Sequence, residues 1–159
     1  MLSTIRDSGI AQLDRLRRRV VSFFGGSTVG VRAIVIGRDR NVLLVRHRYQ
    51  DGWQTPGGGV KPCESPIAAL KRELREETGL EAIGTPELLH VFVHSYRGVT
   101  DFPIFYLVKS FEGTATIMDP REIAELQWVP LETVPNVAAP KTAAFFSEYL
   151  SGAGYREQW

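Results

Sequence analysis

The chain has 159 residues, of which 43% are hydrophobic and 23% are charged, and this composition predicts one globular domain with a substantial core. The formal net charge of +1 excludes the global basic field that marks dedicated nucleic-acid-binding proteins. The single cysteine, Cys63, excludes an internal disulfide and a cysteine-based zinc site. We therefore expect a reducing, cytoplasmic location.

The first 26 residues carry apolar side chains at mostly three- and four-residue spacing, which predicts an amphipathic helix. Several arginines lie among and opposite these side chains, and no apolar run approaches the length that spans a membrane. Three interpretations are open for this helix: packing on the domain or on a partner subunit in a homodimer, contact with an anionic membrane surface, or a leader segment. Gly25 and Gly26 separate the helix from the rest of the chain.

Two apolar, β-branched runs, residues 29–36 and 41–49, flank a polar turn and predict two strands joined by that turn. Residues 88–96 predict a strand whose alternate side chains face opposite sides, with His90, Phe92 and His94 on one side, and residues 101–111 predict the next strand. The short link between them, residues 96–100, predicts a hairpin.

The C-terminal third of the chain continues this mixture of elements. Residues 113–125 predict a loop that ends in a short helical turn, followed by a strand at residues 126–130. The helical spacing of Ala144, Phe145 and Tyr149 predicts a helix over residues 141–150.

Residues 57–80, GGGVKPCESPIAALKRELREETGL, combine a glycine run with a dense acidic cluster. Ser65 followed by Pro66 fits the N-cap and first position of a helix, and Gly79 fits its C-terminal cap. At helical spacing Glu73, Glu76 and Glu77 share one face, so their mutual repulsion raises at least one carboxyl pKa. A hard divalent cation such as Mg²⁺ would relieve that repulsion, because it prefers oxygen ligands.

This stretch resembles the signature box of the Nudix hydrolases: a glycine, a glutamate, and then R-E-apolar-x-E-E-x-G-apolar. Gly58, Glu64 and the run from Arg72 to Leu80 match every specified position. The resemblance implies an α+β fold, an α/β/α sandwich with a central mixed sheet, here preceded by the N-terminal helix. It divides the chain into residues 1–26, a hydrolase domain over residues 27–152, and a tail over residues 153–159.

The resemblance also implies a metal-dependent hydrolase. Such an enzyme cleaves the pyrophosphate linkage of a nucleoside diphosphate derivative by attack of water on phosphorus. Candidate substrates are small molecules: dinucleoside polyphosphates, nucleotide sugars and (d)NTPs. A non-catalytic Nudix-fold nucleotide sensor is the alternative, although such a module would usually have lost acids of the box.

Residue roles follow from the same resemblance. Mg²⁺ or Mn²⁺ would be held by the Gly57 carbonyl, Glu73, Glu76, Glu77 and Glu122. The expected base is Glu73 or a loop glutamate, Glu122 or else Glu125. Arg72 would orient Glu73 or pair with Glu64, while Gly58, Glu64 and Gly79 shape the box.

Three residues outside the box are candidate substrate contacts. Arg46 and Trp53 lie on the segment that leads into the box, where a cation could hold phosphate and an aromatic ring could stack on a base. The other interpretation of this pair is a polar strand end and a packed tryptophan. Tyr96 stands where certain Nudix hydrolases of dinucleoside polyphosphates carry a tyrosine.

Overall fold

The computed structural model describes residues 26–96 and 98–159. The predicted N-terminal amphipathic helix, except for its last residue, therefore lies outside the described residues. The strands are β1 (Ser27–Val35), β2 (Asn41–His47), β3 (Glu81–Ala82), β4 (Glu87–Val91), β5 (His94–Tyr96), β6 (Val99–Val108), β7 (Phe111–Glu112) and β8 (Ile123–Pro130). The α-helices are α2 (Pro66–Thr78), α3 (Val134–Val137) and α4 (Pro140–Ser151), and short 3₁₀ turns cover Arg38–Arg40 and Leu131–Thr133.

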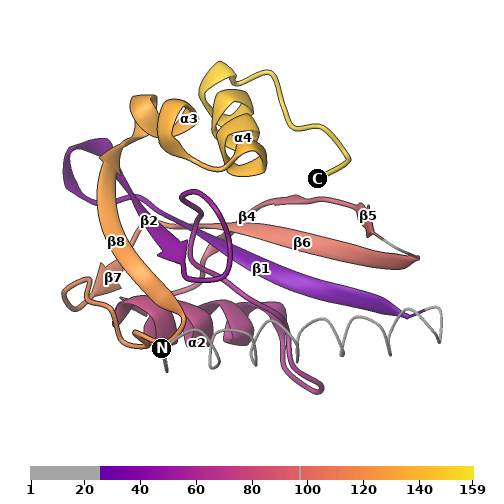
Figure 1. The fold of residues 1–159 in the computed structure, drawn as a ribbon, viewed down its shortest axis with the longest axis horizontal. Coiled ribbons are helices and arrows are strands. Elements are labelled where there is room, and N and C mark those ends of the chain that lie inside the picture. Colours follow the sequence, from indigo (N-terminus) through magenta and orange to yellow (C-terminus); the bar gives the residue numbers. More distant parts are fainter. Residues whose placement is uncertain (1–25, 97) are drawn as a thin grey trace, which may run out of the picture.

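The central sheet is mixed, as the sequence predicts. β1 pairs in parallel with β6, and β6 pairs antiparallel with β4 and β5. In Figure 1, α2 lies along one side of this sheet, whereas α3 and α4 lie on the other. The α+β sandwich expected from the sequence is confirmed for the described residues.

Two apolar clusters fill the spaces on the two sides of the sheet. Leu70 and Leu74 of α2 belong to the first cluster, with Val31 and other side chains from the same face of β1. Phe145 and Phe146 of α4 belong to the second, which contacts the opposite face of β1 through Ile34. Because alternate strand residues face opposite sides, one strand supplies both clusters.

The first two strands differ from the predicted arrangement. Both form, but β2 pairs antiparallel with β8, and the Ile36–Val42 bridge joins its start to the end of β1. The polar turn therefore leads the chain from the sheet of β1 into a second, two-stranded sheet. This transfer positions the C-terminal end of β2 over the box helix.

Three further segments refine the prediction. The alternating run at residues 88–96 is divided into β4 and β5 at the fully buried Phe92, and β5 forms the expected hairpin with β6. The helical turn expected before residue 126 is a hydrogen-bonded turn, after which β8 already begins at Ile123. Residues 153–159 return to the sheet, where Trp159 donates a backbone hydrogen bond to Val93 and packs on the second apolar cluster.

Candidate active site

Helix α2 begins and ends as its sequence predicts. Ser65 caps its first turn by accepting a hydrogen bond from the Ala68 amide at 3.2 Å, and Pro66 occupies the first helical position. Gly79 ends the helix with a φ of 71°. Burial of Leu70 and Leu74 fixes the rotation of the helix, so its acidic face points away from the first apolar cluster.

The glycine run is hydrogen-bonded to β1 and lies beside the helix. The Val31 amide donates to the Gly58 carbonyl at 2.8 Å, and the Val60 amide donates to the Val29 carbonyl at 2.9 Å. At Gly57 the φ of 149° disfavours other residues, and a Cβ atom would lie 2.0 Å from the Val31 carbonyl oxygen. The backbone can therefore approach β1 only because residue 57 is glycine.

Arg72 connects the acids of the box. Its Nε and Nη2 atoms donate to the two carboxylate oxygens of Glu64 at 2.7 and 2.9 Å. Its Nη1 atom lies 2.6 Å from Glu73 Oε1 and 3.2 Å from Glu76 Oε2. The hydrogen bond from Arg72 lowers the pKa of Glu64 to about 2, so this carboxylate stays ionised at neutral pH. Both contacts expected of Arg72 are thus present.

Burial dominates the electrostatics of the other box acids. The side chain of Glu77 is 4% exposed, and its Oε2 atom accepts a hydrogen bond from the Gly57 amide at 3.0 Å. Burial, with a smaller contribution from the charges of Glu73 and Glu122, raises the pKa of Glu77 to about 8. Burial also raises the pKa of Glu73 despite its pairing with Arg72. The sequence predicted a raised pKa from repulsion alone, whereas desolvation is the larger cause.

Glu122 reaches the box from the loop before β8. Its side chain accepts a 2.5 Å hydrogen bond from the Tyr49 hydroxyl, and its backbone carbonyl accepts one from the Arg48 amide at 2.9 Å. The alternative loop acid, Glu125, pairs with Arg46 on the β2–β8 ladder. Of the two glutamates, Glu122 is the one that lies at the acidic cleft.

A cleft of about 370 Å³ lies between the acidic face of α2 and this loop. It is lined by Glu73, Glu76, Glu77, Met118, Asp119, Arg121 and Glu122. Sequence reasoning did not single out Met118, Asp119 or Arg121, because their position beside the acidic face of α2 depends on how the loop folds. The Met118 and Thr116 amides bond to the carbonyls of Glu77 and Thr78, which attaches the loop to the end of the helix.

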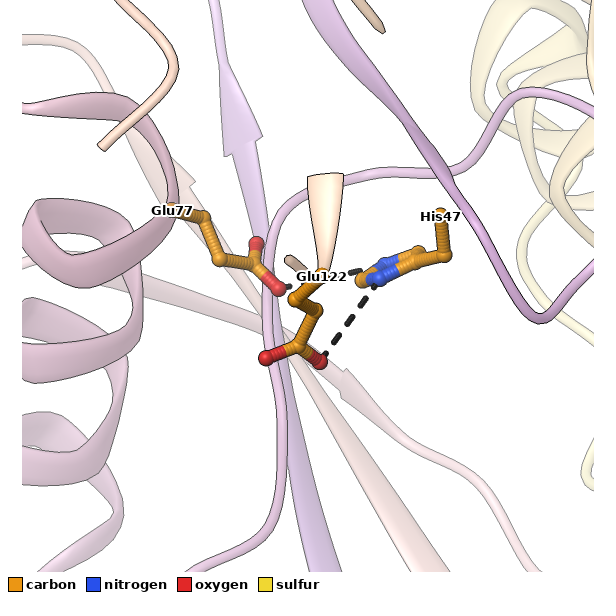
Figure 2. Close-up of side chains that lie close together, drawn as sticks. All are labelled: His47, Glu77 and Glu122. Atoms are coloured by element: carbon orange, nitrogen blue, oxygen red, sulfur yellow. Dashed lines mark ion pairs between the residues drawn. The ribbon is translucent and has the colours of Figure 1, made fainter. Parts of the chain in front are cut away.

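His47 is a further residue that sequence reasoning missed. It ends β2 with a side chain only 3% exposed, close to Glu77 and Glu122, as Figure 2 shows. Burial, together with the nearby charge of Arg32, lowers the pKa of His47 to about 4, so the ring is neutral at pH 7. Strand alternation was the available signal: Leu43 contributes to the cluster beneath α2, and His47 lies four residues further along the same strand.

The two candidate substrate contacts whose side chains the structure describes do not line the cleft. Arg46 forms an ion pair with Glu125, and Trp53 packs against the second apolar cluster while its carbonyl accepts from the Ala139 amide. Neither residue is part of the cleft lining given above. The side chain of Tyr96 lies outside the part of the chain that the structure describes.

The donor set fits a divalent cation. Five carboxylates, those of Asp119 and four glutamates, line one cleft, and behind them His47 keeps both ring nitrogens buried without a hydrogen-bond partner among the described residues. Hard divalent ions accept carboxylate oxygens, and many transition-metal ions also accept imidazole nitrogen. His47, Glu77 and Glu122 each offer a ligand atom, and these three atoms lie within 4.8 Å of one another.

A family model of the NUDIX domain matches residues 26–150. The chain belongs to the Nudix hydrolase family. It is 30% identical over 131 residues to a Bacillus subtilis (strain 168) protein named "Putative 8-oxo-dGTP diphosphatase", a match that covers 79% of this chain and 82% of that protein. It is 49% identical over 55 residues to the RNA pyrophosphohydrolase of Halorhodospira halophila, but this match covers only 35% of this chain and 30% of that enzyme. These matches support a pyrophosphohydrolase.

Solved structures of Nudix hydrolases share the fold. A MutT NUDIX hydrolase from Burkholderia pseudomallei superimposes with a TM-score of 0.67 at 28% identity, covering 76% of this chain and 96% of its own. The E. coli ORF135 protein gives a TM-score of 0.66 at 31% identity, covering 79% and 89% of the two chains. Within residues 26–96 and 98–159, no helix combines the length and hydropathy needed to cross a bilayer.

Proposed function

We propose that this Nudix protein is a divalent-metal-dependent hydrolase that cleaves the pyrophosphate linkage of a nucleoside diphosphate derivative by attack of water on phosphorus. The observation that carries the proposal is the convergence of Glu73, Glu76, Glu77 and Glu122 on one cleft. Clustered carboxylates repel phosphate when no cation lies between them. Clustered acids become useful when a cation binds between them and the substrate.

A divalent cation bound there would screen the phosphate charges and lower the pKa of a water molecule, which supplies the nucleophile. Glu76, Glu77 and Glu122 would hold the cation, with the Gly57 carbonyl as an additional ligand. Glu73 is the proposed base. Its pKa is raised by burial, which makes its carboxylate a stronger base, and its contact with Arg72 fixes the direction of that carboxylate.

The proposed substrate class is a nucleoside triphosphate or another small nucleoside diphosphate derivative. The name of the Bacillus subtilis relative favours an oxidised purine deoxynucleotide as the first compound to test. Arg121 lines the cleft and its pairing with Asp119 leaves it largely exposed, so it provides a cation for substrate phosphate. Met118 offers an exposed apolar surface beside it.

The experiment is phosphate or nucleotide release from a panel containing 8-oxo-dGTP, the unmodified dNTPs, a dinucleoside polyphosphate and ADP-ribose, each with Mg²⁺, Mn²⁺ or EDTA. We expect cleavage of at least one compound that stops in EDTA. Glu77→Gln should reduce turnover by about a hundredfold or more, because it removes a buried metal ligand. Glu132→Gln, an exposed acid paired with Arg40, is the matched control. If none of these compounds is hydrolysed with either metal ion, the proposal is wrong.

A further inference from the structure

The imidazole of His47 has no hydrogen-bond partner for either ring nitrogen among the described residues, although it is almost completely buried. Buried polar groups are normally paired, and an unpaired one costs free energy of folding. Its surroundings are not apolar either. Nε2 lies 3.8 Å from Glu77 Oε1, and Nδ1 lies 3.8 Å from Glu122 Oε1. The ring thus faces two carboxylates at distances too long for hydrogen bonds.

We propose that His47, Glu77 and Glu122 form a mixed nitrogen–oxygen site that selects a transition-metal ion such as Mn²⁺ or Co²⁺ over Mg²⁺. The proposal goes beyond the metal-dependent hydrolase proposed above, on which it rests, by assigning a nitrogen ligand and an ion preference.

The separations suit a shared ion better than direct contact. With metal–ligand bonds of about 2.0–2.2 Å, two donors on the same ion lie roughly 3 Å apart when adjacent and 4.2 Å apart when opposite. The three ligand atoms lie within 4.8 Å of one another. A small movement of Glu122, whose side chain is 35% exposed, would close the remaining gap.

The other contacts of these residues leave acceptor capacity for an ion on both carboxylates, because a carboxylate oxygen has more than one lone pair. Glu77 uses Oε2 to accept from the Gly57 amide, so Oε1 remains directed at His47. Glu122 Oε1 also accepts from the Tyr49 hydroxyl, which steadies the carboxylate beside the ring. Arg32 is a basic group whose charge acts on His47, and its Nη1 atom lies 3.5 Å from the Gly57 carbonyl oxygen.

The chemistry of the donor set decides which ion it prefers. Mg²⁺ demands oxygen ligands and keeps its waters, so a buried imidazole adds little to its binding. Co²⁺ and Zn²⁺ bind imidazole nitrogen well. Mn²⁺ shares the preference of Mg²⁺ for oxygen but, as a transition-metal ion, accepts a nitrogen donor more readily than Mg²⁺ does. His47 lies behind the lining of the cleft, so it adds nitrogen to the inner side of a site whose open side carries oxygen donors only.

The test uses the full chain without substrate, so that it is independent of hydrolysis. Binding of Mn²⁺, Co²⁺ and Mg²⁺ is measured by calorimetry, and pulsed EPR of the Mn²⁺ complex reports whether nitrogen is coupled to the ion. We expect nitrogen coupling in the wild type. His47→Leu should abolish it and weaken Mn²⁺ and Co²⁺ binding at least tenfold, while Mg²⁺ binding changes less than about twofold. His90→Gln, on β4, is the matched histidine control and should behave as the wild type.

Two results would overturn the inference: a wild-type Mn²⁺ complex without nitrogen coupling, or equal losses of Mg²⁺ and Mn²⁺ affinity in a folded His47 variant. His47→Gln serves as a second variant, and circular dichroism establishes folding for each. In EDTA, His47→Leu should melt no lower than the wild type, because it removes an unpaired buried polar group. Metal-dependent hydrolysis by the wild type can succeed whatever these binding data show, so the two proposals can fail separately.

Discussion

Gly58 leaves the space in which the Glu73 carboxylate lies. A Cβ atom at residue 58 would come within 2.5 Å of Glu73 Oε1 and 2.6 Å of its carboxyl carbon. The glycine run and the acidic helix of the box are therefore one structural unit, although they are separated in the sequence.

Gly58→Ala should consequently displace the Glu73 carboxylate and lower kcat/KM at least tenfold, roughly 1.4 kcal/mol of lost transition-state stabilisation. The matched control is Gly30→Ala, where an added Cβ would meet its nearest neighbour at an ordinary 3.7 Å. Steady-state kinetics with Mg²⁺ and thermal melts of both variants make the comparison. Unchanged kcat/KM in Gly58→Ala would contradict the assignment of Glu73.

Arg72→Lys should lower kcat about ten- to a hundredfold while the protein stays folded, because one ammonium group cannot reproduce the forked contacts of a guanidinium. The Arg72 guanidinium forms ion pairs with Glu64, Glu73 and Glu76 at the same time. Arg75→Lys provides the control on the same helix, since Arg75 is exposed and lies 3.7 Å from Glu81. Equal activities of the two variants would show that Arg72 has no orienting role.

Stability without metal should fall as the pH rises from about 6.5 to about 8. The pKa of Glu77 is raised from 4.5 to about 8, so its contribution is fully present below pH 4.5 and is lost as the pH rises through 8. The pKa of His47 is lowered from 6.5 to about 4, so its contribution changes only below pH 6.5. In the upper window the expected slope is about 1 kcal/mol per pH unit.

Denaturant unfolding in EDTA at several pH values measures this slope. Glu77→Gln should flatten it, because the amide does not ionise in this range. Adding Mg²⁺ to the wild type should also oppose the loss, because a cation favours the ionised carboxylate. A stability that rises with pH in EDTA would rule out a buried, protonated Glu77.

Tyr49→Phe should lower metal-dependent kcat/KM by roughly three- to tenfold, the usual effect of losing one hydrogen bond to a carboxylate. The variant retains the ring beside His47, whose centroid lies 5.2 Å away, and removes only the hydroxyl that donates to Glu122. Tyr149→Phe on α4 is a suitable control. Full activity of Tyr49→Phe would mean that Glu122 is positioned by its backbone alone.

The parts of the site that could be predicted from sequence are those with local causes. Ser65, Pro66 and Gly79 define a helix from adjacent residues, and helical spacing then brings the three box glutamates together. The contacts of Arg72 with Glu64 and Glu73 follow from the same short stretch. No distant strand pairing is needed for any of these features.

The remaining parts depend on contacts between distant segments. The antiparallel register of β2 and β8 places Arg46 opposite Glu125 and His47 opposite Ile123, next to Glu122. Arg46 therefore pairs with Glu125, whereas His47 lies near Glu122 and also faces Glu77 of α2. Alternation places Arg46 and His47 on opposite faces of the strand, but the sequence alone does not show which face a distant helix covers.

The three donors of the mixed site stand on segments that are joined only by tertiary structure: the end of β2, the last turn of α2 and the loop before β8. An ion shared by His47, Glu77 and Glu122 would be a reversible cross-link between these three segments. Its loading would slow amide hydrogen exchange at all three positions together, and the unfolded chain would have no equivalent site. Ion binding would thereby indicate that these three segments have reached their folded arrangement.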